Sequence, residues 1–268
     1  MGMDSICMNV QALIIHLERA EKRRDHVNAL LASLPMPGQI IAAVDGQSLS
    51  DTEIRAFYKR RLHSPLYPFS LTRNEIACML SHRRAWQTII DLNLDAALIM
   101  EDDAGPTSDF CSSLSLGLLR VQEDGFIRFP FRDGREEGPV IAWAGQTRMI
   151  SPNRLGLGMV TQLVSHEAAR KLLDATSRFD RPVDVLMQMP WITGVNPTSI
   201  VPGAIRELSY SLGGSTIVRR RTLASKIYHE IMRPAYRLLI AMRSRNYRRE
   251  RKAPIASVNL SEPAKADS

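Results

Sequence analysis

The chain of 268 residues is long enough to bury one substantial core, and its 44% hydrophobic and 24% charged residues exclude a protein that is disordered throughout. Its net charge of +7 is unevenly distributed, because residues 219–252 carry twelve Lys or Arg against two Glu, a balance of +10 that leaves the rest at −3. The basic character therefore belongs to a C-terminal segment and says nothing about the body of the protein.

The first residues do not match the pattern of a secretory leader. Residues 10–17 form an apolar run, but Gln11 and His16 interrupt it, no basic segment precedes it and no small-residue cleavage site follows it. No apolar stretch approaches the ~20 residues that a membrane-spanning helix requires. We therefore expect a cytoplasmic protein that begins close to Met1.

The cysteines are Cys7, Cys78 and Cys111. Their odd number and wide spacing argue against a disulfide framework, and no histidine accompanies them in a zinc-binding pattern. We expect buried or idle thiols.

Strands and helices alternate through the first half of the chain. Apolar runs predict the strands, helical spacing of leucines predicts the first helix, and two capping-box patterns predict the next two. The predicted elements are strands at 12–17, 39–44 and 95–100, and helices at 19–34, after Ser50, and from Thr72 to Asn93. This alternation predicts an α/β protein with a mainly parallel sheet that helices cover on both faces.

The second half of the chain is less regular. It predicts a helix at 110–122, strands at 140–144 and 158–164, a helix at 165–175 and a strand at 199–201. Internal repeats, a Walker loop and a G-x-G-x-x-G fingerprint are absent from the sequence.

An apolar strand leads directly into three carboxylates, Glu101, Asp102 and Asp103. Because side chains alternate along an extended chain, we expect Glu101 and Asp103 on one side and Asp102 on the other. Two carboxylates on one side raise each other's pKa unless a cation or a donor network lies between them. The strand end is also where α/β sheets collect ligands.

Oxygen ligands alone favour a hard ion, Mg²⁺ or Mn²⁺, which also binds water and substrate phosphate. A nucleotide-sugar site fits this description. The alternative is a solvated acidic turn after a strand, and the three residues alone do not separate the two.

Several short motifs follow one another along the chain in a fixed order. They are Ile15–Arg19 with Arg23, Ala43–Gly46, Leu71–Cys78, Leu80–Arg83 with Trp86 and Leu98–Asp103, with weaker ones at Ala168–Leu173, Pro182–Asp184 and Gly213–Ile217. Together they resemble glycosyltransferase family 25, the lipooligosaccharide biosynthesis family that includes the collagen galactosyltransferases. The resemblance covers about residues 10–218.

The resemblance implies a GT-A type, Rossmann-like fold with a mainly parallel mixed sheet flanked by helices. It also implies a UDP-hexose donor, galactose or glucose, and inverting transfer to a saccharide acceptor, expected to be lipid-linked, in lipopolysaccharide or a related surface glycan. Glu101 and Asp103 would hold Mn²⁺ or Mg²⁺ on the donor diphosphate, and Asp102 would contact ribose or brace the loop.

The remaining donor contacts follow from the same resemblance. Arg19 and Arg23 can reach a nucleotide or its phosphates, although Arg23 could equally lie on a solvated helix face. Asp45 suits uracil or ribose donors, and Gly46 permits a close backbone approach. The family pattern makes Ser81 and His82 candidates for donor binding; within a helix they could instead bond neighbouring backbone or water.

Inversion requires a base that deprotonates the acceptor hydroxyl, and we assign this role to Asp184, which could alternatively cap a helix. One departure from the family concerns residues 159–164, where an aromatic residue is usual and none is present. We therefore expect a different or weaker acceptor preference.

The sequence divides into a catalytic domain at 1–218, a basic helical extension at 219–252 and a disordered tail at 253–268. In the extension, apolar residues fall on one helical face and charged ones on the other, and Pro234 is expected to kink the helix. The apolar residues are Leu223, Ile227, Ile231, Ala235, Leu238 and Met242, and the charged ones are Lys226, Glu230, Arg233 and Arg237.

Such a helix suits an anionic membrane surface, which predicts peripheral attachment at the cytoplasmic leaflet. Alternatively, the apolar stripe packs on the catalytic body and leaves the arginines solvated. Nucleic acid is not expected as a partner, because it would leave the acidic cluster unexplained. A catalytically inactive family homologue that acts as a partner subunit is the main rival to an enzyme.

Overall fold

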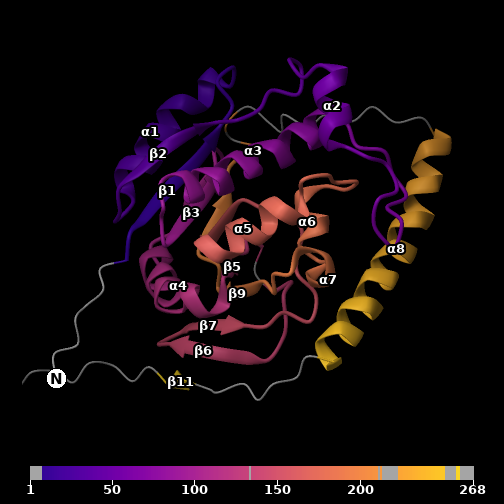
Figure 1. The fold of residues 1–268 in the computed structure, drawn as a ribbon. Coiled ribbons are helices and arrows are strands. Elements are labelled where there is room, and N and C mark those ends of the chain that lie inside the picture. The colour runs from indigo at the N-terminus through magenta and orange to yellow at the C-terminus, as the bar shows by residue number, and fades with distance from the viewer. Residues whose placement is uncertain (1–7, 133, 211, 213–222, 251–257, 260–268) are drawn as a thin grey trace, which may run out of the picture.

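The computed structural model describes residues 8–132, 134–210, 212, 223–250 and 258–259 (Figure 1). Its strands are β1 (Val10–His16), β2 (Gly38–Ala42), β3 (Ala96–Glu101), β4 (Ala104–Pro106), β5 (Phe126–Arg128), β6 (Val140–Ala144), β7 (Thr147–Ile150), β8 (Thr161–Ser165), β9 (Thr198–Val201), β10 (Ile205–Glu207) and β11 (Val258–Asn259). Its helices are the short 3₁₀ helix η1 (Glu21–Arg23), α1 (Arg24–Ser33), α2 (Asp51–Phe57), α3 (Arg73–Asp91), α4 (Phe110–Asp124), α5 (His166–Ala175), α6 (Val183–Leu186), α7 (Pro190–Thr193) and α8 (Leu223–Glu250).

Nine strands form one sheet in the order β11-β6-β7-β9-β5-β8-β3-β1-β2. Strands β2, β1 and β3 are parallel neighbours, whereas β8 runs antiparallel to both β3 and β5. The predicted α/β class with a mixed sheet flanked by helices is therefore confirmed. The parallel strands bring the ends of β1, β2 and β3 to one edge of the sheet.

Two cores cover the two faces of the sheet, and alternating residues of the central strands divide between them. In β1, Leu13 and Ile15 contribute to the core under α3 and α5, while Ala12 and Ile14 contribute to the core under α1 and α4. From Ala12 to Ile15 the residues on both sides of β1 are apolar and buried, which explains why this part of the strand is a continuous apolar run rather than an alternating one.

Helix α3 begins where its sequence predicts. Thr72 Oγ1 accepts a hydrogen bond from the Glu75 backbone N–H, and the Glu75 carboxylate accepts one from the Thr72 backbone N–H. This reciprocal cap fixes the start of the helix, so that its buried face, with Met79 and Trp86, packs against the sheet. The same face carries Ser81 and His82 to the edge where β1, β2 and β3 end.

Helix α8 lies along one side of the molecule, beside α7 (Figure 1). It contacts the body through Tyr236 and Ile240, which are 6% and 1% exposed. The apolar stripe predicted from the sequence does not pack there: Ala235, Leu238 and Met242 are exposed. The alternative in which that stripe covers the catalytic body is therefore wrong for these three residues, because Tyr236 and Ile240 lie on the opposite side of the helix.

None of the helices in the described ranges combines the length and apolar character needed to cross a membrane. The predicted domain boundary at 218 and the motif at Gly213–Ile217 lie outside the described residues, as does the predicted tail at 253–268 except for β11.

Candidate active site

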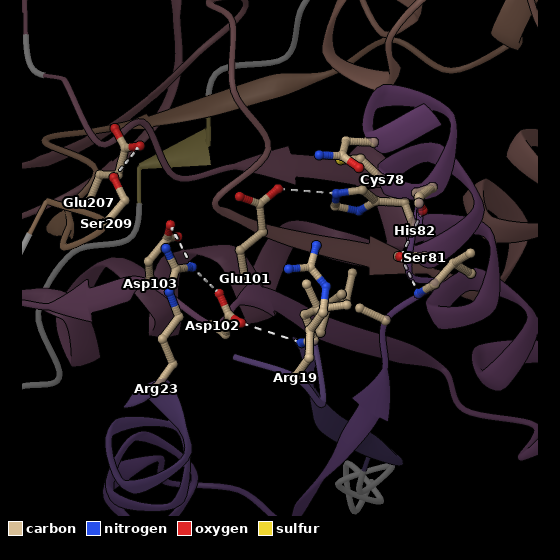
Figure 2. Close-up of a pocket in the computed structure, with 17 residues that line it drawn as sticks. Arg19, Arg23, Cys78, Ser81, His82, Glu101, Asp102, Asp103, Glu207 and Ser209 are labelled. Carbon is tan, nitrogen blue, oxygen red and sulfur yellow. Dashed lines mark hydrogen bonds and ion pairs between the residues drawn. The ribbon is translucent and has the colours of Figure 1, made fainter. Parts of the chain in front are cut away.

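The ends of the three parallel strands and the first half of α3 enclose a cavity of about 220 Å³, here called the first cavity (Figure 2). Figure 2 shows Arg23, Asp102 and Asp103 on one side of it, His82 of α3 on the other, and Glu101 between them. The acidic stretch thus lies at the carboxyl edge of the sheet, as expected from the sequence.

Asp102 is a buried anchor. His16 Nδ1 donates to its Oδ2 over 3.0 Å, and Arg23 Nη1 donates to its Oδ1. The expected alternation of the three carboxylates does not continue past Glu101, because β3 ends there and Arg23 contacts both Asp102 and Asp103. These contacts give Asp102 the bracing role; its contact with ribose stays a prediction.

Arg23 is only 5% exposed, so the alternative of a solvated helix face is wrong for this residue. Its guanidinium balances only part of the negative charge around it. Asp103 Oδ2 lies 3.2 Å from Arg23 Nη1, whereas Asp103 Oδ1 is buried and has no hydrogen-bond partner in the described parts of the chain.

Burial, reinforced by the neighbouring Glu101 carboxylate, raises the pKa of Asp103 to about 7. The Glu101 side chain remains 29% exposed to the cavity. Both carboxylates line the first cavity, and one Asp103 oxygen is buried without a partner in the described residues, so the pair could hold a hard divalent cation.

Two neighbouring residues of α3 have different contacts. Ser81 Oγ donates to the Ala77 carbonyl and accepts from the Val44 backbone N–H over 2.8 Å, so it ties the helix to the end of β2. His82 is buried between Gln162 and Glu101, with Nδ1 3.0 Å from the Gln162 amide nitrogen and Nε2 3.3 Å from Glu101 Oε1. The amide donates to Nδ1, which leaves the proton on Nε2, facing Glu101.

Cys78 also lies beside Glu101. The potential ligand atoms of Cys78, His82 and Glu101 all lie within 4.8 Å of one another. The expectation that no histidine accompanies the cysteines is therefore wrong for Cys78: the four-residue spacing to His82 on one helix was the available signal. Burial and the surrounding carboxylates raise the pKa of the Cys78 thiol well above its usual range, so the thiol is protonated.

Arg19, Asp45 and Gly46 follow β1 and β2. Arg19 Nε donates to Asp45 Oδ2 over 2.7 Å, and the Gln47 backbone N–H together with Arg19 lowers the pKa of Asp45. A Cβ on Gly46 would clash with Asn74 Oδ1, so only glycine allows this loop to approach α3 so closely. Arg19 and Gly46 line the first cavity; Asp45 lines a neighbouring groove instead.

Asp184 lies in a separate, larger cavity of about 570 Å³, here called the second cavity. Its Oδ2 accepts from the Gly158 backbone N–H over 3.0 Å and its Oδ1 from the Val185 N–H over 2.8 Å. It is not the N-cap of α6, since Pro182 holds that position. Burial raises the pKa of the Asp184 carboxyl, with a smaller contribution from Glu101.

The two cavities share three lining residues, Cys78, Glu101 and Glu207. Glu207 was missed in the sequence, because β10 is only three residues long and has no recognisable pattern. Aromatic side chains of the second cavity, Tyr67, Phe131 and Tyr236, were missed for a similar reason, since they come from loops and from α8. They supply apolar rings although residues 159–164 contain none.

The molecule is thus an α/β protein with a charged cavity at the carboxyl edge of its sheet, the position at which such folds bind nucleotides. Residues 9–136 match the family model described as Glycosyltransferase family 25 (LPS biosynthesis protein). This match over residues 9–136 confirms the resemblance to glycosyltransferase family 25 that the motifs indicate.

Curated relatives align with less than half of the chain. Procollagen galactosyltransferase 2 of Mus musculus is 37% identical over 127 residues, which are 46% of this chain and 19% of that protein. The protein named inactive glycosyltransferase 25 family member 3 of Homo sapiens is 32% identical over 117 residues, 42% of this chain and 19% of that protein. The chain thus spans about a fifth of the length of these relatives.

Among solved structures, the crystal structure of mannose-1-phosphate geranyltransferase from Thermus thermophilus is similar over 72% of this chain and 74% of that chain. The TM-score is 0.34 and the sequence identity is 10%, which supports no functional assignment.

Proposed function

We propose that this chain transfers a hexosyl group, galactose or glucose, from a UDP-sugar to a hydroxyl of a saccharide acceptor, in the synthesis of lipopolysaccharide or a related surface glycan. The observation that carries the proposal is the meeting of the two cavities at Glu101, where a donor in the first would face an acceptor in the second. The family match over residues 9–136 and the galactosyltransferase named among the relatives support it.

The donor occupies the first cavity. Arg19 is 41% exposed at its side chain and can leave Asp45 to contact a diphosphate, while Gly46 lets the nucleotide approach the backbone. Asp45 suits uracil or ribose from the neighbouring groove, and Asp102 remains a candidate for ribose. Ser81 and His82 support the donor site mainly by positioning, because they bond to Val44, Gln162 and Glu101.

Glu101 and Asp103 would hold Mn²⁺ or Mg²⁺, and the unpartnered Asp103 Oδ1 fits this ligand role. When bound, the ion supplies positive charge that stabilises the departing diphosphate. His82 Nε2 orients the Glu101 carboxylate, and Arg23 holds both aspartates in place.

Asp184 is the proposed base. The acceptor oxygen forms a bond to the anomeric carbon while the bond from that carbon to the diphosphate oxygen breaks; the hydroxyl proton passes to Asp184, and UDP leaves. Attack from the second cavity, opposite the leaving group in the first, inverts the anomeric centre. The raised pKa of Asp184 makes it a better proton acceptor than an ordinary aspartate once it is ionised.

The direct test is UDP release from UDP-galactose and UDP-glucose, with Mn²⁺ and with EDTA. We expect UDP release from only one of the two donors, and only when the metal ion is present. If neither donor releases UDP in the presence of a mixture of saccharide acceptors, the proposal of an active transferase is contradicted.

The alternative function is that of a catalytically inactive homologue which binds the donor and acts as a partner subunit. The similarity to a human family member named inactive supports it. Calorimetry and the UDP-release measurement together separate the two functions. An inactive homologue binds UDP-hexose with Mn²⁺ but releases no UDP, whereas an enzyme binds the donor and releases UDP.

We also propose that α8 attaches the protein peripherally to an anionic membrane at the cytoplasmic face, where a lipid-linked acceptor would be found. Leu238 and Met242 are 62% and 56% exposed on its outer face, and Arg245 lies beside them. The double change Leu238→Ser with Met242→Ser should weaken binding to phosphatidylglycerol vesicles about tenfold, from lost apolar burial. Leu119→Ser on α4, where Leu119 is 66% exposed, is the control. Equal binding of the parent, the double variant and Leu119→Ser to the vesicles would refute the membrane attachment.

A further inference from the structure

The second cavity is unusually rich in arginine. Six of its lining residues are arginines, and they come from β5, from the two loops that follow β5 and β7, and from α8: Arg128, Arg132, Arg135, Arg154, Arg233 and Arg237. Because these segments are far apart in the sequence, no single charged motif reveals the cluster.

Two of these arginines are occupied by the protein itself. Arg128 is buried, forms an ion pair with Glu136 and donates to the Leu157 carbonyl over 2.8 Å. Arg132 Nη2 lies 3.8 Å from Glu207 Oε2, and its guanidinium stacks on the Phe131 ring. Arg128 shapes the wall, and Arg132 has a weak, exposed partner that a ligand can replace.

The other four arginines have no ion-pair or hydrogen-bond partner within the part of the chain that the structure describes. Arg135, Arg154 and Arg237 are exposed and Arg233 is half-buried. Five carboxylates also line the cavity, and two of them pair with Arg128 and Arg132: Glu75, Glu101, Glu136, Asp184 and Glu207. None of the five pairs with Arg135, Arg154, Arg233 or Arg237 in the described parts of the chain, so an anion beside these four arginines would gain charge-assisted hydrogen bonds.

Helix α8 is fixed in a position that turns its arginines toward this cavity. Tyr236, between Arg233 and Arg237, accepts a hydrogen bond from Arg181 Nη1 over 2.5 Å, and Arg181 is fully buried in an ion pair with Asp180. Arg233 and Arg237 are four residues apart and therefore lie on one side of the helix. The outer apolar face points the other way, so these two arginines are separate from the proposed membrane contact.

We propose that the second cavity binds an acceptor saccharide that carries phosphate, with the sugar against the aromatic rings and the phosphate among Arg135, Arg154, Arg233 and Arg237. A phosphate monoester offers three acceptor oxygens and nearly two charges, which matches several guanidinium groups better than a single carboxylate does. The inference rests on the proposed function, since it assigns the second cavity to the acceptor. It adds a chemical class of acceptor and gives α8 a part in selecting it.

The test uses calorimetry on the full chain saturated with UDP and Mn²⁺, which fill the first cavity. Glucose 6-phosphate should bind at one site at least about tenfold more tightly than glucose, and Arg233→Gln and Arg237→Gln should each weaken that binding about tenfold. Arg237→Lys keeps the charge and should lose less. Arg245→Gln, an exposed change on the proposed membrane-facing side of the same helix and outside the cavity, should leave glucose 6-phosphate binding unchanged.

Equal binding of glucose and glucose 6-phosphate would overturn the inference, as would a loss in Arg245→Gln as large as that in Arg237→Gln. Phosphatidylglycerol vesicles form a separate arm: if Arg233→Gln and Arg237→Gln lose vesicle binding and keep sugar phosphate binding, the arginines serve lipid headgroups and the inference fails. Binding of UDP with Mn²⁺ is measured first. Its absence would count against the proposed function, whereas its presence without sugar phosphate binding would count against this inference alone.

Discussion

The two cavities are built by different means. The first lies between the ends of regular elements, and several of its charges are held by the protein itself, as Asp102 and Asp103 are by Arg23, although one Asp103 oxygen has no partner in the described residues. The second is walled by loops and by α8, and four of its arginines have no partner among the described residues. The first cavity is thus organised before a ligand arrives, while the second leaves its charges available. Under the proposed function, this contrast places donor binding in the first cavity and the choice of acceptor in the second.

The largest expected effect tests whether the first cavity holds the ion. Glu101→Gln removes one charged ligand and should lower kcat/KM by about 10³-fold, because the departing diphosphate then loses its counter-charge. The measurement is UDP release across a Mn²⁺ titration. Glu123→Gln, on the exposed surface of α4, is the control and should leave the rate unchanged. A rate within about threefold of the parent for Glu101→Gln would break the assignment of the first cavity.

The second prediction concerns the base in the second cavity. Asp184→Asn should lower kcat about 10²- to 10³-fold while binding of UDP with Mn²⁺ is retained, since Asp184 lies outside the first cavity. Below its pKa Asp184 is protonated and cannot accept the hydroxyl proton, so the rate of the parent should fall as pH is lowered. Because burial raises that pKa, the fall should begin at a higher pH than for an ordinary aspartate. An unchanged acid limb in Asp184→Asn would contradict the role.

The third prediction tests the paired charges of the first cavity. Asp102→Asn removes one partner of a buried ion pair and leaves Arg23 partly uncompensated, which should lower the free energy of unfolding by about 3 kcal/mol. Chemical denaturation of the parent and the variant measures this. Glu167→Gln breaks an exposed pair with Arg170, which solvent screens, and should lower the free energy of unfolding far less. Equal losses of unfolding free energy in the two variants would mean that the buried pairs of the first cavity stabilise the fold no more than an exposed pair does.

The smallest predicted effect sharpens the account of α8. Tyr236→Phe removes the hydrogen bond from the buried Arg181 and should lower the free energy of unfolding by about 2 kcal/mol. Tyr210→Phe is a matched change at a residue that is 97% exposed and should have no measurable effect. If Tyr236→Phe behaves like Tyr210→Phe, the helix is not held against the second cavity in the way described.

The sequence predicts the first cavity better than the second for a physical reason. Glu101 follows an apolar strand and Thr72 begins a capping box, so local pattern and position in the chain suffice to bring their elements together. The sequence places Asp102 and Asp103 at this edge but does not give the directions of their side chains, because the strand ends before them and Arg23 contacts both from another element. Arg154 and Arg237 meet only through loops and helix docking, which no local pattern encodes.

The most direct test of the central claim is a crystal structure with UDP-galactose or UDP and manganese. The account predicts an anomalous manganese peak bound to the carboxylates of Glu101 and Asp103, with the diphosphate on it and the uridine near Gly46. A peak at Cys78 and His82 without Asp103, or a nucleotide in the second cavity, would contradict it.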